Sequence, residues 1–217
     1  MIAAMSNNNG FLSELLSLTK PYENKIKSIF IPTTHGTGSE VTKWGTIWNT
    51  KNKKKYSISH DDLYPSIAIL DASLTTSLPL DISIITILDA LSHSFEAIWN
   101  KNANSQSTEL AIDAICLILN NINIFKNNYR DVLIRKKMMI ASNKAGLAFS
   151  NTKTAAAHSI SYPLTIDFGI PHGIASSISL IPLLKINNYS IKKPLSEIFN
   201  RLDTDFDTLL NQINLIP

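Results

Sequence analysis

An aspartate and a histidine four residues apart form the first pair in this sequence with the chemistry of a functional site. Asp89 and His93 stand in the segment Asp-Ala-Leu-Ser-His-Ser-Phe-Glu, and a helix would place the carboxylate and the imidazole on one face. Two ligands on one rigid face are frequent in metal sites. The same spacing also occurs in surface pairs and helix caps, so the pair alone leaves both interpretations open.

Two further histidines favour a metal centre. His158 follows three alanines and His172 lies in a Pro-His-Gly turn, and neither segment is typical of solvated surface. A buried histidine needs polar partners. Three histidines with one aspartate form a mixed nitrogen and oxygen set, which suits Fe²⁺ or Zn²⁺ better than Mg²⁺ or Ca²⁺.

A loop rich in glycine and hydroxyl side chains follows a predicted strand. Residues 31–42 read Ile-Pro-Thr-Thr-His-Gly-Thr-Gly-Ser-Glu-Val-Thr, and the backbone N–H groups of such a loop can approach a phosphate or a ribose. Because Gly-Thr-Gly-Ser is also common in ordinary turns, the loop alone favours neither interpretation.

The elements that must position these residues differ between the two halves of the chain. Residues 27–34 and 66–71 predict short buried strands, and 45–49 with 55–59 predict a hairpin around a lysine-rich turn. Beyond Pro79 a helical period runs through 84–99, 109–125, 132–149 and 174–184. Two weaker helical patterns follow in 191–216, where Thr204 or Asp205 is a candidate cap. The sequence predicts an α/β N-terminal part, 1–78, followed by an all-α part, 79–217.

Composition narrows the class of protein. The 217 residues are 44% hydrophobic and 17% charged, which indicates a packed core rather than disorder. A net charge of +3 gives no indication of nucleic-acid binding. The single cysteine, Cys116, stands in an apolar run, which predicts a core position and a reducing compartment. With no signal peptide or uninterrupted apolar span of ~18 residues, we expect a cytoplasmic protein without a membrane partner.

Four motifs in register resemble the iron-containing (group III) alcohol dehydrogenases. They are Pro-Thr-Thr-x-Gly-Thr-Gly-Ser-Glu-Val-Thr, Asp-Ala-Leu-x-His-x-x-Glu, Ala-Gly-x-Ala-Phe-Ser-Asn and Pro-His-Gly, spread over residues 29–188. The resemblance implies an incomplete Rossmann-like nucleotide-binding region in 1–78 and a helical metal-binding catalytic domain in 79–217. The metal ligands it implies are Asp89, His93, His158 and His172. The nicotinamide contacts it implies are Thr33, Thr34, Thr37, Ser39, Thr42 and Lys55.

The activity that the resemblance implies is the reversible interconversion of an alcohol and an aldehyde. Fe²⁺ or Zn²⁺ would polarise the aldehyde oxygen, and NAD(P)H would deliver the hydride. Tyr162 replaces the second histidine that many family members carry four residues after the third ligand. With the flanking residues, this departure resembles the phosphonoacetaldehyde reductase branch, whose product is 2-hydroxyethylphosphonate.

Two side chains near the third ligand are therefore candidate catalytic residues. Lys153 can supply a charge to a phosphonate, although it is equally typical of a solvated lysine at the start of a helix. Tyr162 can hydrogen-bond the substrate oxygen, but with an ordinary pKa near ~10 a tyrosine relays protons less well than a histidine at neutral pH. The expected partner is a small aldehyde or alcohol, and a homodimer stays open.

The family's Gly-Gly-Gly-Ser phosphate loop and closing C-terminal helices have no counterpart in this sequence. Only Gly10 precedes Gly36, so the chain resembles the central part of a longer enzyme. Two alternatives follow. One is a catalytically silent, metal-binding remnant. The other is a generic short-chain aldehyde or diol dehydrogenase, which is favoured if Lys153 points away from the cleft.

Overall fold

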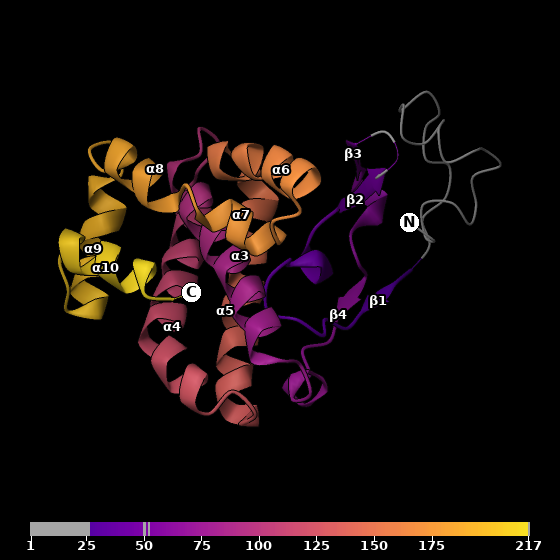
Figure 1. The fold of residues 1–217 in the computed structure, drawn as a ribbon, viewed down its shortest axis with the longest axis horizontal. Helices are drawn as coiled ribbons and strands as arrows, with labels where there is room; N and C mark the ends of the chain where they lie inside the picture. The colour runs from indigo at the N-terminus through magenta and orange to yellow at the C-terminus, as the bar shows by residue number, and fades with distance from the viewer. Residues whose placement is uncertain (1–26, 50, 52, 217) are drawn as a thin grey trace.

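The computed structural model describes residues 27–49, 51 and 53–216. Within them, short β elements come first and helices follow (Figure 1). The β elements are β1 (Ile29–Phe30), β2 (Trp44–Asn49), β3 (Lys54–Ser59) and β4 (Ile67–Ala68), with 3-10 turns η1 (Ser39–Val41), η2 (Asp61–Leu63) and η3 (Ala72–Thr75). The helices are α3 (Leu80–Trp99), α4 (Ser105–Asn127), α5 (Val132–Thr152), α6 (Ala156–Phe168), α7 (His172–Ser177), α8 (Leu180–Asn187), α9 (Lys192–Leu202) and α10 (Phe206–Asn214). This arrangement confirms the predicted fold class, although the start of the α/β part, residues 1–26, lies outside the described residues.

The predicted hairpin is confirmed, but the two strands predicted as buried over 27–34 and 66–71 are shorter than predicted and exposed. β2 and β3 pair antiparallel from Trp44↔Ser59 to Asn49↔Lys54. β1 pairs with β4 in parallel through only two residues each, with Ile29 opposite Ile67. A strand is regular only where neighbours complete its ladder, and within the described residues each of these two strands has one neighbour.

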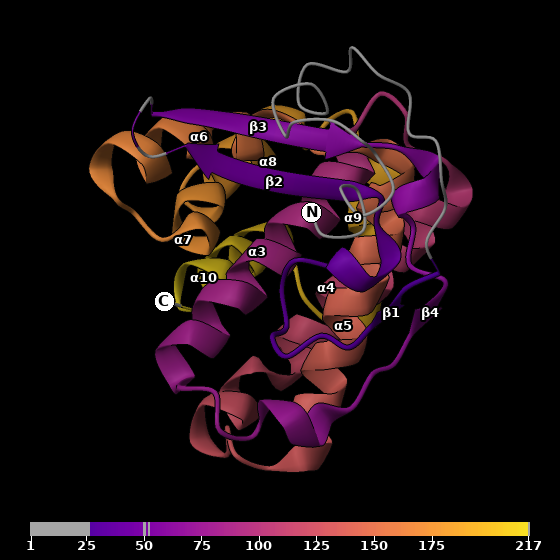
Figure 2. The same cartoon turned by 90° about the vertical axis from the view of Figure 1, so that its right-hand side faces the viewer.

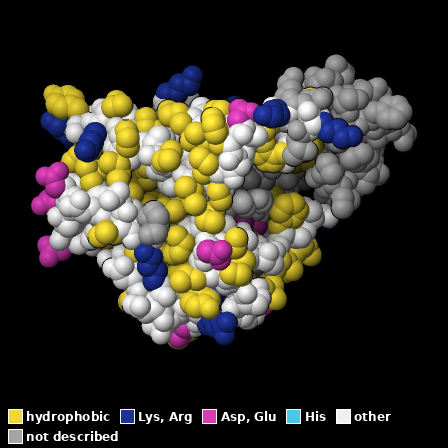
Figure 3. All heavy atoms as spheres, in the orientation of Figure 1, with side chains coloured by type: hydrophobic (Ala, Val, Ile, Leu, Met, Phe, Trp, Pro, Cys, Tyr) yellow, Lys and Arg dark blue, Asp and Glu magenta, His cyan; other side chains and the backbone are white. Residues whose placement is uncertain are grey.

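The β1–β4 pair leaves apolar side chains uncovered. Ile29 is 59% exposed and Ile67 is 52% exposed, and Ile31 and Ile69 beside them are also exposed. Figure 3 shows hydrophobic side chains gathered on the side of the molecule where Figure 1 places these strands. Parallel sheets are ordinarily covered on both faces, and the described residues do not provide that cover.

Three long helices form the core that holds the functional residues. α3, α4 and α5 pack against one another through fully buried side chains such as Leu91, Phe95 and Ile115. A capping box begins α4, since the Asn104 side chain accepts from the Ser107 backbone and the Ser107 hydroxyl accepts from the Asn104 backbone. By length and composition α3 and α4 also pass as membrane spans, but 78% and 50% of their apolar windows are buried inside the protein. Burial of this kind is typical of core helices.

The last helices differ in part from the prediction. The pattern over 174–184 predicts one helix, and the chain forms two, α7 and α8, interrupted after Ser177. Asp205 caps α10 by accepting from the Thr208 backbone, as the sequence predicts. α6 was not predicted, because it contains Pro163 and buries only Ala157, His158 and Ser161, which gives no apolar stripe.

A buried histidine fixes the start of the hydroxyl loop against the helices. His35 is fully buried, its Nε2 lies 3.1 Å from Thr75 Oγ1, and its ring meets Phe125 edge-on. Burial, assisted by the positive charge of Arg135, lowers the pKa of His35 to about 4. The imidazole is therefore neutral in the folded protein at pH values where the unfolded chain would protonate it.

This histidine makes the fold sensitive to acid. The folded pKa lies below the unfolded value, so its contribution to stability is complete above about pH 6.5 and is lost as the pH falls toward 4. We expect His35 to account for about 2 kcal/mol of the fall in unfolding free energy between pH 7 and pH 4.5. Urea unfolding of the wild type and of His35→Gln over this range should show a flatter curve for the variant. Parallel curves would contradict the assignment.

Candidate metal centre

Three buried side chains from two helices meet beside the core. α3 contributes Asp89 and His93 on one face, as their spacing predicts, and the first turn of α6 contributes His158. One ligand atom from each of the three lies within 4.8 Å of the others, and all three residues are buried. A single ion can therefore contact all three.

His172, the first residue of α7, lies at the rim of this cluster. Its Nε2 is 3.8 Å from Asp89 Oδ1, and Nε2 of His158 is 3.3 Å from the same oxygen. The side chain of His172 is 35% exposed, whereas that of His158 is 3% exposed. The structure thus brings the four predicted ligands together, with three at the base and His172 on the open side.

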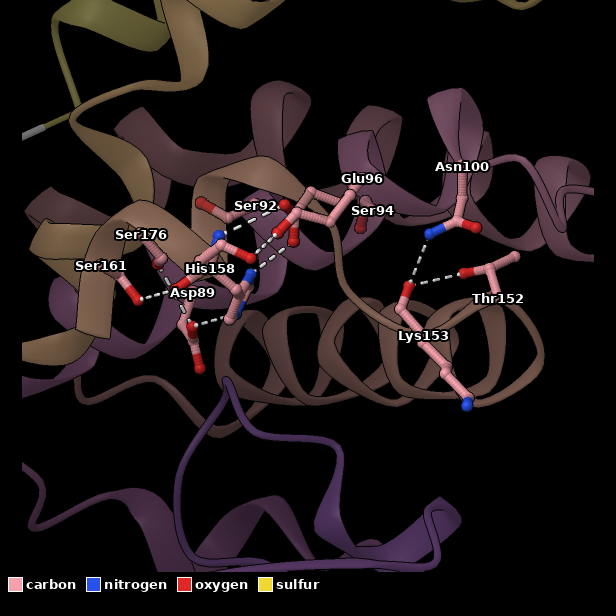
Figure 4. Close-up of polar contacts among 12 residues, drawn as sticks. Asp89, Ser92, Ser94, Glu96, Asn100, Thr152, Lys153, His158, Ser161 and Ser176 are labelled. Atoms are coloured by element: carbon pink, nitrogen blue, oxygen red, sulfur yellow. Dashed lines mark hydrogen bonds and ion pairs between the residues drawn. The ribbon is translucent and has the colours of Figure 1, made fainter. Parts of the chain in front are cut away.

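Two residues outside the predicted ligand set, Glu96 and Ser176, hold His158 and Asp89 in place by hydrogen bonds. The Glu96 carboxylate accepts from the backbone N–H of His158 at 3.2 Å and lies 2.5 Å from Nδ1 of the same residue. The Ser176 hydroxyl donates to Asp89 Oδ1 at 3.3 Å. Figure 4 shows Glu96 and Asp89 on opposite sides of the His158 ring. Glu96 ends the Asp-Ala-Leu-x-His-x-x-Glu motif without a predicted role, and its place seven residues after Asp89 on the same helix is the sequence signal that points to this site.

The donor atoms of the cluster fit a divalent metal ion. Nδ1 of His93 and Nε2 of His158 are buried and have no hydrogen-bond partner among the described residues. Buried polar atoms without partners are costly and rare. Imidazole nitrogens with a carboxylate oxygen are the ligands that Fe²⁺ and Zn²⁺ accept, so an ion bound beside Asp89 would satisfy Nε2 of His158, which the described residues leave without a hydrogen bond.

The charges of the cluster depend on one another. Burial alone would raise the pKa of Asp89, but the three surrounding histidines hold it below its ordinary range. Burial lowers the pKa of His93 to about 4. For His158 burial also acts to lower the pKa, but Asp89 and Glu96 outweigh it and raise the value to about 9. The two carboxylates thus favour a positive charge between them, which a metal ion would supply in place of a proton.

Side chains of the β2–β3 hairpin contact residues on the open side of the cluster, and Figure 2 shows the hairpin running alongside α6. Tyr162 lies parallel to His172 with ring centroids 6.4 Å apart, and Trp48 meets both rings edge-on at 6.4 Å. Lys55 Nζ lies 3.4 Å from the centroid of the Tyr162 ring. The side of the site next to His172 is therefore lined by the aromatic rings of Tyr162 and Trp48, and the Lys55 ammonium group lies against the Tyr162 ring.

Four of the six predicted cofactor contacts gather at one cavity. Thr33, Thr34, Thr37 and Ser39 line a cavity of about 390 Å³ beside β1. The other two do not line it, since Thr42 is buried and Lys55 lies on the hairpin against Tyr162.

Of the two predicted catalytic residues, the structure brings only Tyr162 to the cluster. Lys153 is exposed at the end of α5, where its carbonyl accepts from Asn100 Nδ2 at 3.2 Å. Figure 4 shows Lys153 far from Asp89 and His158, with its side chain pointing away from them. The structure gives Lys153 no contact with the site, as its positive φ of 69° turns the chain out of α5.

The position of His172 depends on a close approach of α7 to α3. A Cβ at Gly173 would lie 1.8 Å from the backbone oxygen of Ile85, so only glycine fits there. We expect Gly173→Ala to lower the unfolding free energy by about 1–3 kcal/mol and to weaken Zn²⁺ affinity by displacing His172. Gly45→Ala, whose Cβ meets nothing within 4 Å, serves as the control in thermal unfolding and metal titration. Equal behaviour of the two variants would refute the argument.

Comparison with known proteins places the whole chain in one family. The C-terminal domain of the Fe-containing alcohol dehydrogenase family matches residues 83–212, and the iron-containing alcohol dehydrogenase domain matches residues 1–72. The probable alcohol dehydrogenase EutG of Escherichia coli is 32% identical over 98% of this chain and 53% of its own length. The phosphonoacetaldehyde reductase of Streptomyces viridochromogenes is 31% identical over 75% of this chain and 41% of its own length.

Solved structures agree with this placement. The sulfoacetaldehyde reductase of Bifidobacterium kashiwanohense, in complex with NAD⁺, has a TM-score of 0.91 and 32% identity over 99% of this chain and 57% of its own. A 1,3-propanediol oxidoreductase has a TM-score of 0.88 at 26% identity over 99% of this chain and 59% of its own. The chain spans about half the length of the curated relatives it matches. The chain belongs to the iron-containing alcohol dehydrogenase family.

Proposed function

We propose that this chain provides the metal-binding and nicotinamide-side part of an NAD(P)H-linked aldehyde reductase that also works as an alcohol dehydrogenase. The observation that carries the proposal is the buried Asp89–His93–His158 cluster, in which two imidazole nitrogens have no hydrogen-bond partner among the described residues. Membership of the iron-containing family supports it.

Asp89, His93, His158 and His172 would hold Fe²⁺ or Zn²⁺, which would polarise a carbonyl oxygen while reduced nicotinamide supplies the hydride. The aromatic side chains of Trp48 and Tyr162 would cover the substrate and exclude water. The Tyr162 hydroxyl is the proposed proton donor to the substrate oxygen as it becomes an alcohol.

The hydroxyl-lined cavity is the proposed site for the nicotinamide half of the cofactor. It lies beside β1, and Thr37 Oγ1 and Ser39 Oγ are 2.8 Å apart on its wall. Thr42 and Lys55 complete the proposed contact set. The complex of the sulfoacetaldehyde reductase with NAD⁺ supports a nicotinamide dinucleotide as cofactor.

Phosphonoacetaldehyde, reduced to 2-hydroxyethylphosphonate, is the proposed substrate. Similarity to the phosphonoacetaldehyde reductase and to the sulfoacetaldehyde reductase supports it, because both named substrates are short aldehydes with an anionic group. The outward direction of Lys153 favours a second candidate, a dehydrogenase of neutral short aldehydes or diols. A phosphonoacetaldehyde reductase has the higher kcat/KM for phosphonoacetaldehyde, whereas a dehydrogenase of neutral aldehydes has the higher kcat/KM for propionaldehyde.

The test is NADH or NADPH oxidation by the Fe²⁺- or Zn²⁺-loaded protein, with the remaining part of a relative supplied as described in the Discussion. Metal- and aldehyde-dependent turnover would support the proposal. Tight metal binding without turnover on any aldehyde would instead support the silent, metal-binding remnant.

His172 should contribute to metal affinity in a way that another histidine does not. We expect His172→Ala to bind Zn²⁺ at least about tenfold more weakly, because the ion must replace an imidazole with water. His60, which lies after β3 with a 38% exposed side chain, provides the control His60→Ala. Equal affinities of the two variants in a chelator competition would exclude His172 as a ligand.

A further inference from the structure

Glu96 uses both of its carboxylate oxygens on one residue. It is fully buried on α3. Its Oε1 accepts from the backbone N–H of His158 at 3.2 Å, and its Oε2 lies 2.5 Å from Nδ1 of the same residue. The backbone and the ring of His158 are thus fixed to α3 by one side chain.

This double contact determines which ring nitrogen is available. A carboxylate can only accept, so Nδ1 of His158 must carry a proton and donate it to Glu96. In the neutral imidazole the free lone pair is then on Nε2, which is 3.3 Å from Asp89 Oδ1 and has no hydrogen-bond partner among the described residues. The open nitrogen therefore lies on the side of the ring that faces Asp89 (Figure 4).

We propose that Glu96 is a positioning residue that fixes the ring orientation and tautomer of His158, so that Nε2 is presented to a metal ion. The inference rests on the proposed metal site and assigns a role to a residue outside the ligand set. Replacing a carboxylate that hydrogen-bonds a metal-ligating histidine typically weakens metal affinity by 10- to 100-fold.

Glutamine has the shape of glutamate but cannot reproduce both contacts. Its amide has one accepting oxygen and one donating nitrogen. One of the two N–H groups of His158 would then face an NH₂ group, or the ring would change tautomer and place its proton on Nε2. Glu96→Gln therefore disturbs the presentation of His158 with little change in volume.

The experiment measures Co²⁺ binding to the full chain by chelator competition and by the visible absorption of the bound ion. Glu96→Gln is expected to weaken binding by about 10- to 100-fold and to alter the absorption bands. The matched control is Glu40→Gln, which changes a buried carboxylate that accepts from Asn143 Nδ2 at 2.9 Å. The control should stay within about twofold of the wild type.

Two outcomes separate this inference from the proposed function. Wild-type affinity and spectrum in Glu96→Gln would overturn the role of Glu96 and leave the metal site intact, whereas failure of the wild type to bind Co²⁺ would overturn both. If the variant does not fold, ¹⁵N NMR of the Zn²⁺-loaded wild type decides. A proton on Nδ1 of His158 is the expected result, and a proton on Nε2 would overturn the proposal.

Discussion

Replacing His158 by alanine is expected to abolish metal binding and to lower the unfolding free energy of the metal-free protein by about 3–5 kcal/mol. The ring lies between Asp89 and Glu96, and both carboxylates are buried. Without the imidazole, two buried carboxylates face each other with no cation between them. Both effects come from the same three residues, so they should appear together.

Urea unfolding and metal analysis after dialysis measure the two effects. His60→Ala, which removes a half-buried side chain that caps η2 by accepting from the Asp62 backbone, should lower the unfolding free energy by only about 1 kcal/mol and leave metal content unchanged. A His158→Ala protein that retains wild-type metal content would show that the ligands lie elsewhere.

Supplying a glycine-loop nucleotide-binding unit is expected to tighten NADH binding by about two orders of magnitude. Backbone N–H groups that donate to the pyrophosphate contribute roughly 1.5–3 kcal/mol each, and in dinucleotide-binding folds they come from a glycine-rich turn before a helix. The hydroxyl cavity beside β1, the proposed nicotinamide site, would provide only the nicotinamide side. Within the described residues β1 and β4 each have one strand neighbour, so further parallel strands would pair at their outer edges and helices would cover their exposed apolar side chains.

The test fuses or co-expresses the chain with the part of the EutG protein of Escherichia coli that it does not match, since this chain covers 53% of that protein. Fluorescence titration with NADH compares the combined protein with the chain alone. Ile67→Lys in β4, at a side chain that is 52% exposed, should weaken the association between the chain and the supplied part of the EutG protein. The control is Leu133→Lys at the start of α5, where the side chain is 73% exposed. Equally tight NADH binding by the chain alone would contradict the expectation.

The fold class followed from the sequence because the periodic signals are strong where the elements are long. α3, α4 and α5 carry wide apolar faces, and their predicted ranges agree with the structure apart from their ends. α6 gave no such signal, since its position is set by contacts of His158 rather than by an apolar stripe. The short parallel strands were overestimated because their length depends on neighbours that local sequence does not reveal.

The sequence predicted which residues meet at the site better than how their side chains are placed. The spacing of Asp89 and His93 fixes a helical face, and the structure brings both to His158 and His172. Sequence could not assign Glu96, because its function arises from two contacts with a residue 62 positions away. It also could not show that Lys153 turns outward, which depends on the backbone at the end of α5.

In the proposed metal centre one ion binds among Asp89, His93 and His158, with His172 at its open side. The most direct measurement is anomalous diffraction from crystals of the chain grown with Zn²⁺. We predict one strong peak in this cluster, with ligand atoms at ~2.0–2.3 Å. A peak at another place, such as His60, with none in the cluster would contradict the account.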